Sequence, residues 1–205
     1  MFLPDPLEIG RSIGAVVSLA RGDAGGLARL DLSFRGFWRS FGVAILVLPF
    51  ALFFTYAERR MWPTAKPDIP VPQPLIHYIA EVLAFVVYWE ALPLAMILIT
   101  RQLHLTARFV PFIVAWNWSN VVTALLLTPP IALYLLGIAS TEAALVVGVA
   151  STLLTVVFQA SIAKITLGIS AWLALGIAVL NLAFGLALAA AADFVPFFLA
   201  PHAAG

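Results

Sequence analysis

The feature that most constrains this chain is a series of five long apolar stretches. A helical membrane span needs about 20 mostly apolar residues to cross about 30 Å of hydrocarbon. Only 10% of the 205 residues are charged, which is too few to cover a soluble domain of this size. We therefore predict an all-α, polytopic transmembrane helix bundle, and we exclude an ordinary soluble enzyme and a nucleic-acid binder. The five predicted spans are Phe37 to Ala57, Leu75 to Ile99, Phe109 to Ile138, Ala143 to about Leu167, and Ser170 to Ala192.

The third stretch is longer than one span requires, and Pro129-Pro130 interrupts it. Proline removes a backbone donor and clashes with the preceding turn, so we expect the helix to kink or end there. A re-entrant sixth element from Ile131 to Ile138 is an alternative, although that segment is too short to cross the membrane.

The segment before the first span predicts an amphipathic helix from Pro6 to Ala20. Its apolar residues recur at helical spacing, and charged residues fall on the opposite face. Such a helix lies either in the lipid headgroup plane or against the cytoplasmic end of the bundle, and the sequence leaves both open. Glycines after residue 21 predict a hinge, and Ser33 is a candidate N-cap for the first span.

This pattern divides the chain into three parts. Residues 1–33 form a cytoplasmic amphipathic and hinge segment, and residues 34–195 form the five-helix transmembrane domain. A proline-rich outer loop, residues 58–74, belongs to the transmembrane domain, and its prolines favour an extended strap. Residues 196–205 form a short outer tail.

The orientation follows from basic residues that flank the spans, because cytoplasmic loops carry an excess of lysine and arginine. The N-terminal segment, the loop after the second span and the loop after the fourth hold more of them than the other side. We therefore predict a multi-pass protein of the cell inner (plasma) membrane, with its N-terminus in the cytoplasm and its C-terminus outside. Trp116 and Trp118 are expected near the cytoplasmic interface and Trp62 near the outer one, as an aromatic belt.

Ionisable side chains within a span usually face the bundle interior or a cavity, and here they concentrate in the second span. His77, Glu81 and Tyr88 share one helix face, whereas Glu90 points elsewhere. His77 and Glu81 are either interfacial structural residues or part of a proton path.

A second set of polar residues in different spans matches in depth at 1.5 Å per residue. We expect Glu90 to face protein and to contact at least one of Asn117, Asn120 and Lys164. The alternative is ordinary hydrogen bonding between helices, worth roughly 0.6 kcal/mol per pair. The predicted intramembrane cluster comprises Glu90, Asn117, Asn120, Gln159, Lys164 and Asn181.

No catalytic constellation is recognisable in the sequence. There is no phosphate-binding glycine loop, no His-Glu-x-x-His and no Gly-x-Ser-x-Gly. His77, His104 and His202 are expected at different ends of the bundle, so they cannot jointly bind one metal ion. We therefore predict no enzymatic activity, no cofactor and no metal site.

The order of parts resembles the Yip1-like five-helix membrane proteins. The resemblance lies in an amphipathic cytoplasmic segment, five spans and an aromatic, polar entry to the third span from Arg108 to Trp118. The entry to the first span, Phe37 to Phe41, is also similar to that of uncharacterised bacterial inner-membrane proteins. The long proline-rich first loop departs from the compact loops expected of the family. The resemblance implies a non-enzymatic role in membrane organisation or complex assembly.

These observations lead to two functional hypotheses. The first is a non-enzymatic accessory or scaffold component of a membrane complex, whose partners are the lipid bilayer and other membrane protein subunits or a second copy. The second is a small permease or channel in which Glu90 carries a proton, because burial would favour exchange near neutral pH. A water-accessible cavity that reaches Glu90 would favour the second hypothesis.

Overall fold

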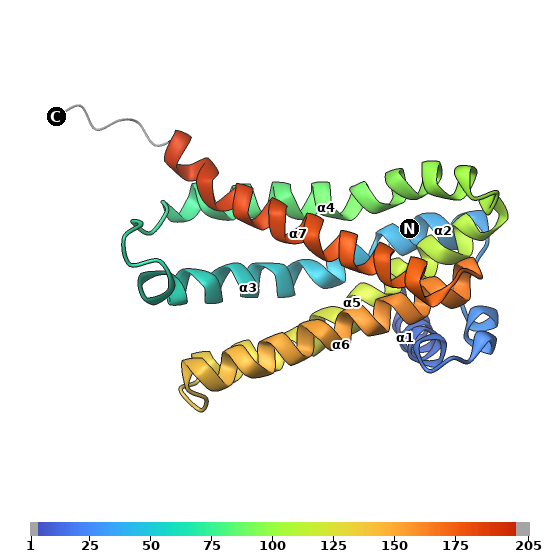
Figure 1. Ribbon diagram of the computed structural model, residues 1–205, viewed down its shortest axis with the longest axis horizontal. Coiled ribbons are helices and arrows are strands. Elements are labelled where there is room, and N and C mark those ends of the chain that lie inside the picture. The colour runs from blue at the N-terminus through green and yellow to red at the C-terminus, as the bar shows by residue number, and fades with distance from the viewer. Residues whose placement is uncertain (1–3, 200–205) are drawn as a thin grey trace.

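The computed structural model describes residues 4–199, which fold into seven α-helices and two short 3₁₀ helices with no strand among them (Figure 1). The α-helices are α1 (Pro6–Ala20), α2 (Phe34–Phe41), α3 (Val43–Ala65), α4 (Pro74–Gln102), α5 (Phe109–Leu135), α6 (Thr141–Leu167) and α7 (Ala171–Leu199). The 3₁₀ helices are η1 (Ala24–Arg29) and η2 (Thr106–Arg108).

Five helical segments within these residues are long and apolar enough to cross a membrane. α2 and α3 together make the first, η2 and α5 together make the third, and α4, α6 and α7 make the others. This arrangement confirms the predicted all-α bundle of five spans. The fold is that of a multi-pass membrane protein.

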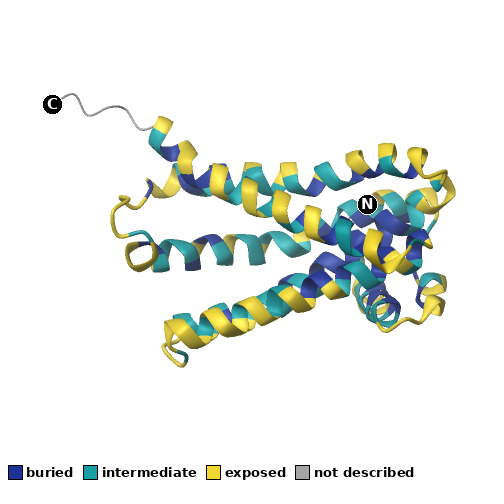
Figure 2. Ribbon diagram, viewed as in Figure 1, coloured by how far each residue is buried: buried dark blue, intermediate teal, exposed yellow. Residues whose placement is uncertain are grey.

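α5 is the central helix of the bundle. Every residue from Phe112 to Asn120 is buried, because α1, α2, α3 and α6 all pack around this half of α5. Figure 2 shows that the buried residues gather at the end of the bundle that carries α1. Trp116 and Trp118 belong to this core and are 3% and 2% exposed, so their predicted place in an interfacial belt is wrong.

The amphipathic helix is α1, and it packs against the bundle instead of lying free. Val16 and Leu19 are fully buried in the same core as Trp118 of α5. Glu8 on α1 pairs with Arg39 of α2, which fixes the helix to the first span. Ser33 caps α2 by accepting a hydrogen bond from the Gly36 backbone N–H, as predicted.

Three predicted boundaries are wrong because helices tolerate proline here. α5 continues through Pro129-Pro130 to Leu135, so no separate re-entrant element forms. α3 continues to Ala65, so the irregular loop between α3 and α4 covers residues 66–73 and not 58–74. α7 continues through residues 196–199, and the rest of the predicted tail, including His202, lies outside the described residues. Proline within an apolar helix is tolerated where neighbouring helices cover the freed backbone groups.

The bundle has two different ends (Figure 1). One end carries α1, η1 and the loops that join α4 to α5 and α6 to α7. The opposite end, which we call the distal end, carries the loop from α3 to α4, the loop from α5 to α6 and the C-terminal part of α7. The polar site described next lies at the distal end.

Candidate functional site: a charged cluster beside an apolar cavity

The predicted intramembrane cluster around Glu90 does not form. Glu90 is exposed on the outer surface of α4 and makes no hydrogen bond or ion pair with any residue from 4 to 199. Lys164 of α6 is also exposed, and its side chain has no such partner within that range. The expectation that Glu90 faces protein is therefore wrong. That expectation compares only the depths of the polar residues along their helices, and depth does not determine which face of a helix points inward.

The other members of the predicted cluster form separate pairs, each between two helices. The Asn117 amide of α5 donates to the Ser40 hydroxyl of α2 at 3.0 Å. The Gln159 amide of α6 donates to Asn120 of α5 at 3.3 Å. A third pair joins Asn181 of α7 to the Tyr88 hydroxyl of α4 at 2.5 Å. These contacts are those expected of hydrogen bonding between helices.

The largest group of ionisable side chains lies instead at the distal end, where α3, α4 and α7 meet. His77 of α4 is fully buried, and its Nε2 atom lies 3.2 Å from Asp193 Oδ1 and 3.7 Å from Glu81 Oε1. Lys66, just after α3, lies 2.6 Å from Asp193 Oδ2 and 3.3 Å from Glu58 Oε1. We call Glu58, Arg59, Lys66, His77, Glu81 and Asp193 the distal cluster.

Arg59 determines which ring nitrogen of His77 accepts a hydrogen bond. Its guanidinium donates to His77 Nδ1 at 3.1 Å and to the Pro72 carbonyl at 2.9 Å. Because arginine can only donate, Nδ1 must be the unprotonated acceptor of the ring. The ring proton of a neutral His77 is then on Nε2, where it is donated to Asp193.

Lys66 holds its charge more firmly than an ordinary lysine. Burial alone would lower the pKa of the Lys66 ammonium, but its hydrogen bond to Asp193 and the negative charges of Asp193 and Glu58 outweigh that effect. The net result is a raised pKa. Lys66 also lies 3.8 Å from the centre of the Trp62 ring, and a cation over an aromatic face is further stabilised.

The distal cluster carries one negative charge that is not balanced. The cluster holds three carboxylates and two cationic side chains, Lys66 against Glu58 and Asp193 and Arg59 against His77. The carboxylate without a hydrogen-bonding cation is that of Glu81, whose Oε1 atom is buried and lacks a hydrogen-bond partner. A buried charge of this kind is costly unless a proton or a cation neutralises it.

A metal ion is one cation to consider. Glu58, His77, Glu81 and Asp193 each offer a ligand atom, and these atoms lie within 4.8 Å of one another. Histidine with carboxylates suits zinc, manganese or iron. However, the His77 nitrogen that faces the carboxylates carries the ring proton, and Lys66 already lies between Glu58 and Asp193. The contacts therefore fit a metal ion poorly.

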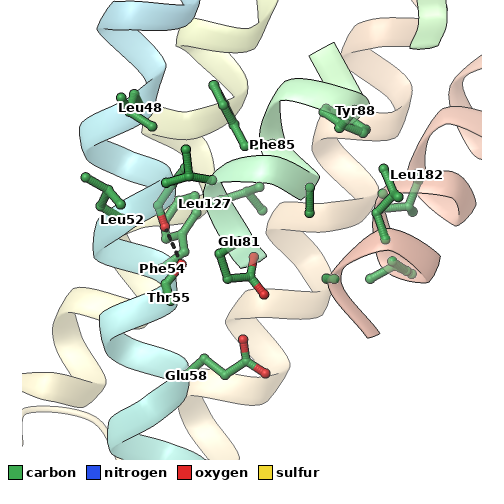
Figure 3. Close-up of a pocket in the computed structure, with 17 residues that line it drawn as sticks. Leu48, Leu52, Phe54, Thr55, Glu58, Glu81, Phe85, Tyr88, Leu127 and Leu182 are labelled. Atoms are coloured by element: carbon green, nitrogen blue, oxygen red, sulfur yellow. Dashed lines mark hydrogen bonds between the residues drawn. The ribbon is translucent and has the colours of Figure 1, made fainter. Parts of the chain in front are cut away.

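An apolar cavity of about 390 Å³ adjoins the cluster (Figure 3). α3, α4 and α7 form most of its wall, and Leu127 of α5 completes it. The carboxylates of Glu58 and Glu81 lie at one end of the cavity, and Tyr88 lies about 10 Å farther along α4 at 1.5 Å per residue. Its other lining residues are almost all apolar. Cavities of this size with a few polar groups are typical of small-molecule sites.

Sequence reasoning identified part of this site. Of the expected face, Glu81 and Tyr88 line the cavity, and His77 lies beside Glu81 in the distal cluster. Tyr88 pairs with Asn181 and not with the cluster. The sequence does not indicate Glu58, Lys66 and Asp193 as part of this site, because they lie on α3, just after α3 and on α7. The sequence does contain one indication of the site, because acidic residues occur near the distal ends of both α3 and α7. Helix ends that meet at one face of a bundle bring such residues together.

Comparison with protein-family models, curated proteins and solved structures found no match for this chain. The resemblance to the Yip1-like proteins remains a prediction from the order of the parts.

Proposed function

We propose that this chain is a non-enzymatic integral membrane protein that acts as a scaffold or accessory subunit of a larger membrane complex. The observation that carries the proposal is the position of Glu90. It lies exposed on a membrane-spanning helix and makes no hydrogen bond or ion pair with any residue that the structure describes.

The depth of Glu90 makes this exposure costly. Glu90 is about 18 Å from the C-terminal end of α4 at 1.5 Å per residue, which places it near the middle of the helix. A charged carboxylate at the centre of a span costs roughly 2.5–3.5 kcal/mol by insertion measurements. A second membrane protein that covers Glu90 and offers a hydrogen bond would remove most of this cost.

The residues around Glu90 have the pattern of a helix-docking face. α4 exposes large apolar side chains before and after Glu90 at the spacing of three and four residues that follows one face of a helix. Together they form a continuous apolar stripe with one acidic group at its centre. The stripe, which we call the α4 face, consists of Leu83, Val87, Glu90, Leu94 and Leu98.

The charge of Glu90 indicates the chemistry of the partner. A symmetric contact between the α4 faces of two copies, centred on Glu90, would place two carboxylates together, and α4 has no lysine or arginine before Arg101 to neutralise them. A transmembrane helix of a different protein, with a lysine, arginine or other donor at the depth of Glu90, fits better. We place the complex in the inner membrane with the α1 end toward the cytoplasm, on the strength of the basic residues near that end.

The permease hypothesis with Glu90 has less support. It requires Glu90 to face a water-accessible path inside the bundle, but the cavity beside α4 is lined by Glu81 and Tyr88 and not by Glu90. The half of the bundle near α1 is filled by buried apolar residues of α1, α5 and α6. A transport path from the cavity to that end would have to pass through this core.

The proposal is tested by purification from native membranes. Wild type, Glu90→Gln and Glu90→Leu are tagged and extracted in mild detergent, and the associated proteins are measured by quantitative mass spectrometry. Glu142→Leu is the matched control, because Glu142 is an exposed glutamate at the start of α6. We expect one set of membrane proteins to be retained by the control, reduced by Glu90→Gln and lost with Glu90→Leu. Equal recovery with all four proteins, or substrate turnover by the isolated chain, would contradict the proposal.

A further inference from the structure

We propose that the cavity between α3, α4 and α7 is a binding site for a lipophilic primary amine, with the ammonium group on Glu81 and Glu58 and the apolar body along the cavity toward Tyr88. This site lies on a different face of α4 from Glu90, so it is independent of the scaffold function. Three properties of the site support it: its charge, its shape and its lining.

One monovalent cation would neutralise the net charge of the distal cluster. Lys66 donates to both Asp193 and Glu58, whereas Arg59 donates to His77 and to the Pro72 carbonyl. Three carboxylates near two cationic side chains leave one negative charge, and Glu81 keeps a buried oxygen atom without a donor. One ammonium group would balance the cluster and supply that donor, since its three N–H groups can reach more than one carboxylate. A divalent ion would overcompensate the charge unless Lys66 moved away.

The shape and lining of the cavity indicate that the part of the ligand beyond its ammonium group is an apolar chain. Its wall beyond the carboxylates is built mainly from leucine, alanine and phenylalanine side chains, with Thr55 and Tyr88 as the polar ones, so a hydrated inorganic cation gains little from it. The distance of about 10 Å from Glu81 to Tyr88 accommodates an extended chain of roughly eight carbon atoms. An apolar chain buried there contributes about 0.8 kcal/mol for each CH₂ group removed from water.

One glycine keeps the deep part of the cavity open. Gly185 of α7 faces Tyr88, and a Cβ atom at Gly185 would lie 3.0 Å from Tyr88 Cε2. A larger side chain at this position would push the Tyr88 ring or fill the cavity. Gly185→Leu is therefore a variant that blocks the apolar part without touching the carboxylates.

The experiment uses two photoreactive probes of equal length, octylamine and octanol, each with a diazirine in the middle of its chain. The full-length protein in lipid nanodiscs is irradiated with each probe, and the labelled peptides are mapped by mass spectrometry. We expect the amine to label the α4 and α7 segments that line the cavity about tenfold more than the alcohol, as the loss of a hydrogen bond to a charged group implies. Excess unlabelled octylamine should compete with this labelling.

Three variants separate the contributions. Glu81→Gln should remove the preference for the amine and leave equal labelling by both probes. Gly185→Leu should reduce labelling by both probes. Glu90→Gln is the matched control for a carboxylate in the same helix, and it should keep the full preference even if it loses the membrane partner.

Two results would overturn the proposal. If wild-type protein is labelled equally by the amine and the alcohol, the cavity takes apolar chains without regard to charge. If Zn²⁺ or Mn²⁺ alone binds to wild type and not to His77→Gln, and the amine shows no preference, the distal cluster is a metal site. Neither result bears on Glu90, so the amine site and the scaffold function can fail separately.

Discussion

Replacing Lys66 with methionine should destabilise the protein by about 2 kcal/mol. Removal of one partner from a fully buried ion pair costs roughly 3–5 kcal/mol, because the other charge is left uncompensated. The Asp193 side chain is only 12% exposed, but that of Lys66 is 33% exposed, so water screens part of the interaction. Glu58, 3.3 Å from Lys66, loses the same cation and adds to the cost.

The matched control is Arg29→Met, which breaks the pair between Arg29 and Asp23 at 3.4 Å. Both of those side chains are about half exposed, and surface pairs contribute roughly 0.2–1 kcal/mol. The free energy of unfolding is measured by titration with sodium dodecyl sulfate in mixed micelles, followed by tryptophan fluorescence. If Lys66→Met and Arg29→Met cost the same at neutral pH, the distal cluster is not the buried charge network described above.

Four further substitutions test other parts of the fold in the same unfolding assay. Gly26→Ala should lower the free energy of unfolding by about 1–3 kcal/mol, because the added Cβ atom would lie 2.6 Å from a backbone oxygen of α1. Gly10→Ala should instead stabilise α1 by about 0.5–1 kcal/mol, because no atom lies within 4 Å of the added Cβ. Equal effects of the two changes would mean that η1 does not pack tightly on α1. Asn120→Leu should cost about 0.6 kcal/mol through loss of its hydrogen bond to α6, and a cost above 3 kcal/mol would show that this pair does more than join two helices. The pKa of Asp31 is lowered, chiefly by its hydrogen bonds to Ser33. The ionised Asp31 therefore stabilises the fold above its ordinary pKa of 3.8, and this stabilisation is lost as the pH falls through the lower pKa of the folded state. Asp31→Asn should make the loss of stability below pH 3.8 less steep.

The helices could be predicted from the sequence because length and hydropathy are local properties. The boundaries of α1 follow from its apolar spacing, and the Ser33 cap follows from residue type. The predicted ends of α3 and α5 are wrong because Pro63 and Pro129-Pro130 lie within helices that continue past them. A proline rule taken from water-soluble helices overestimates breaks in an apolar environment, where an unpaired backbone group costs more.

The site was harder to predict because it depends on the rotation and pairing of helices. The sequence gives the position of Glu90 along α4, but the face on which it lies depends on which helices pack beside α4. The contacts with α3 and α7 bury His77 and leave Glu90 outside. Asp193 joins His77 across 116 positions of the chain, and no periodicity within one helix indicates such a contact.

The measurement that tests the scaffold function most directly is site-specific photocrosslinking from the α4 face in native membranes. A photoreactive amino acid is placed at Val87 or Leu94, beside Glu90, and at Leu153 of α6 as an exposed apolar control. We predict one discrete protein adduct from Val87 and Leu94, none from Leu153, and loss of the adduct when Glu90→Leu is added. Adducts with lipid alone at all three positions, unchanged by Glu90→Leu, would show that Glu90 faces the bilayer and would contradict the account.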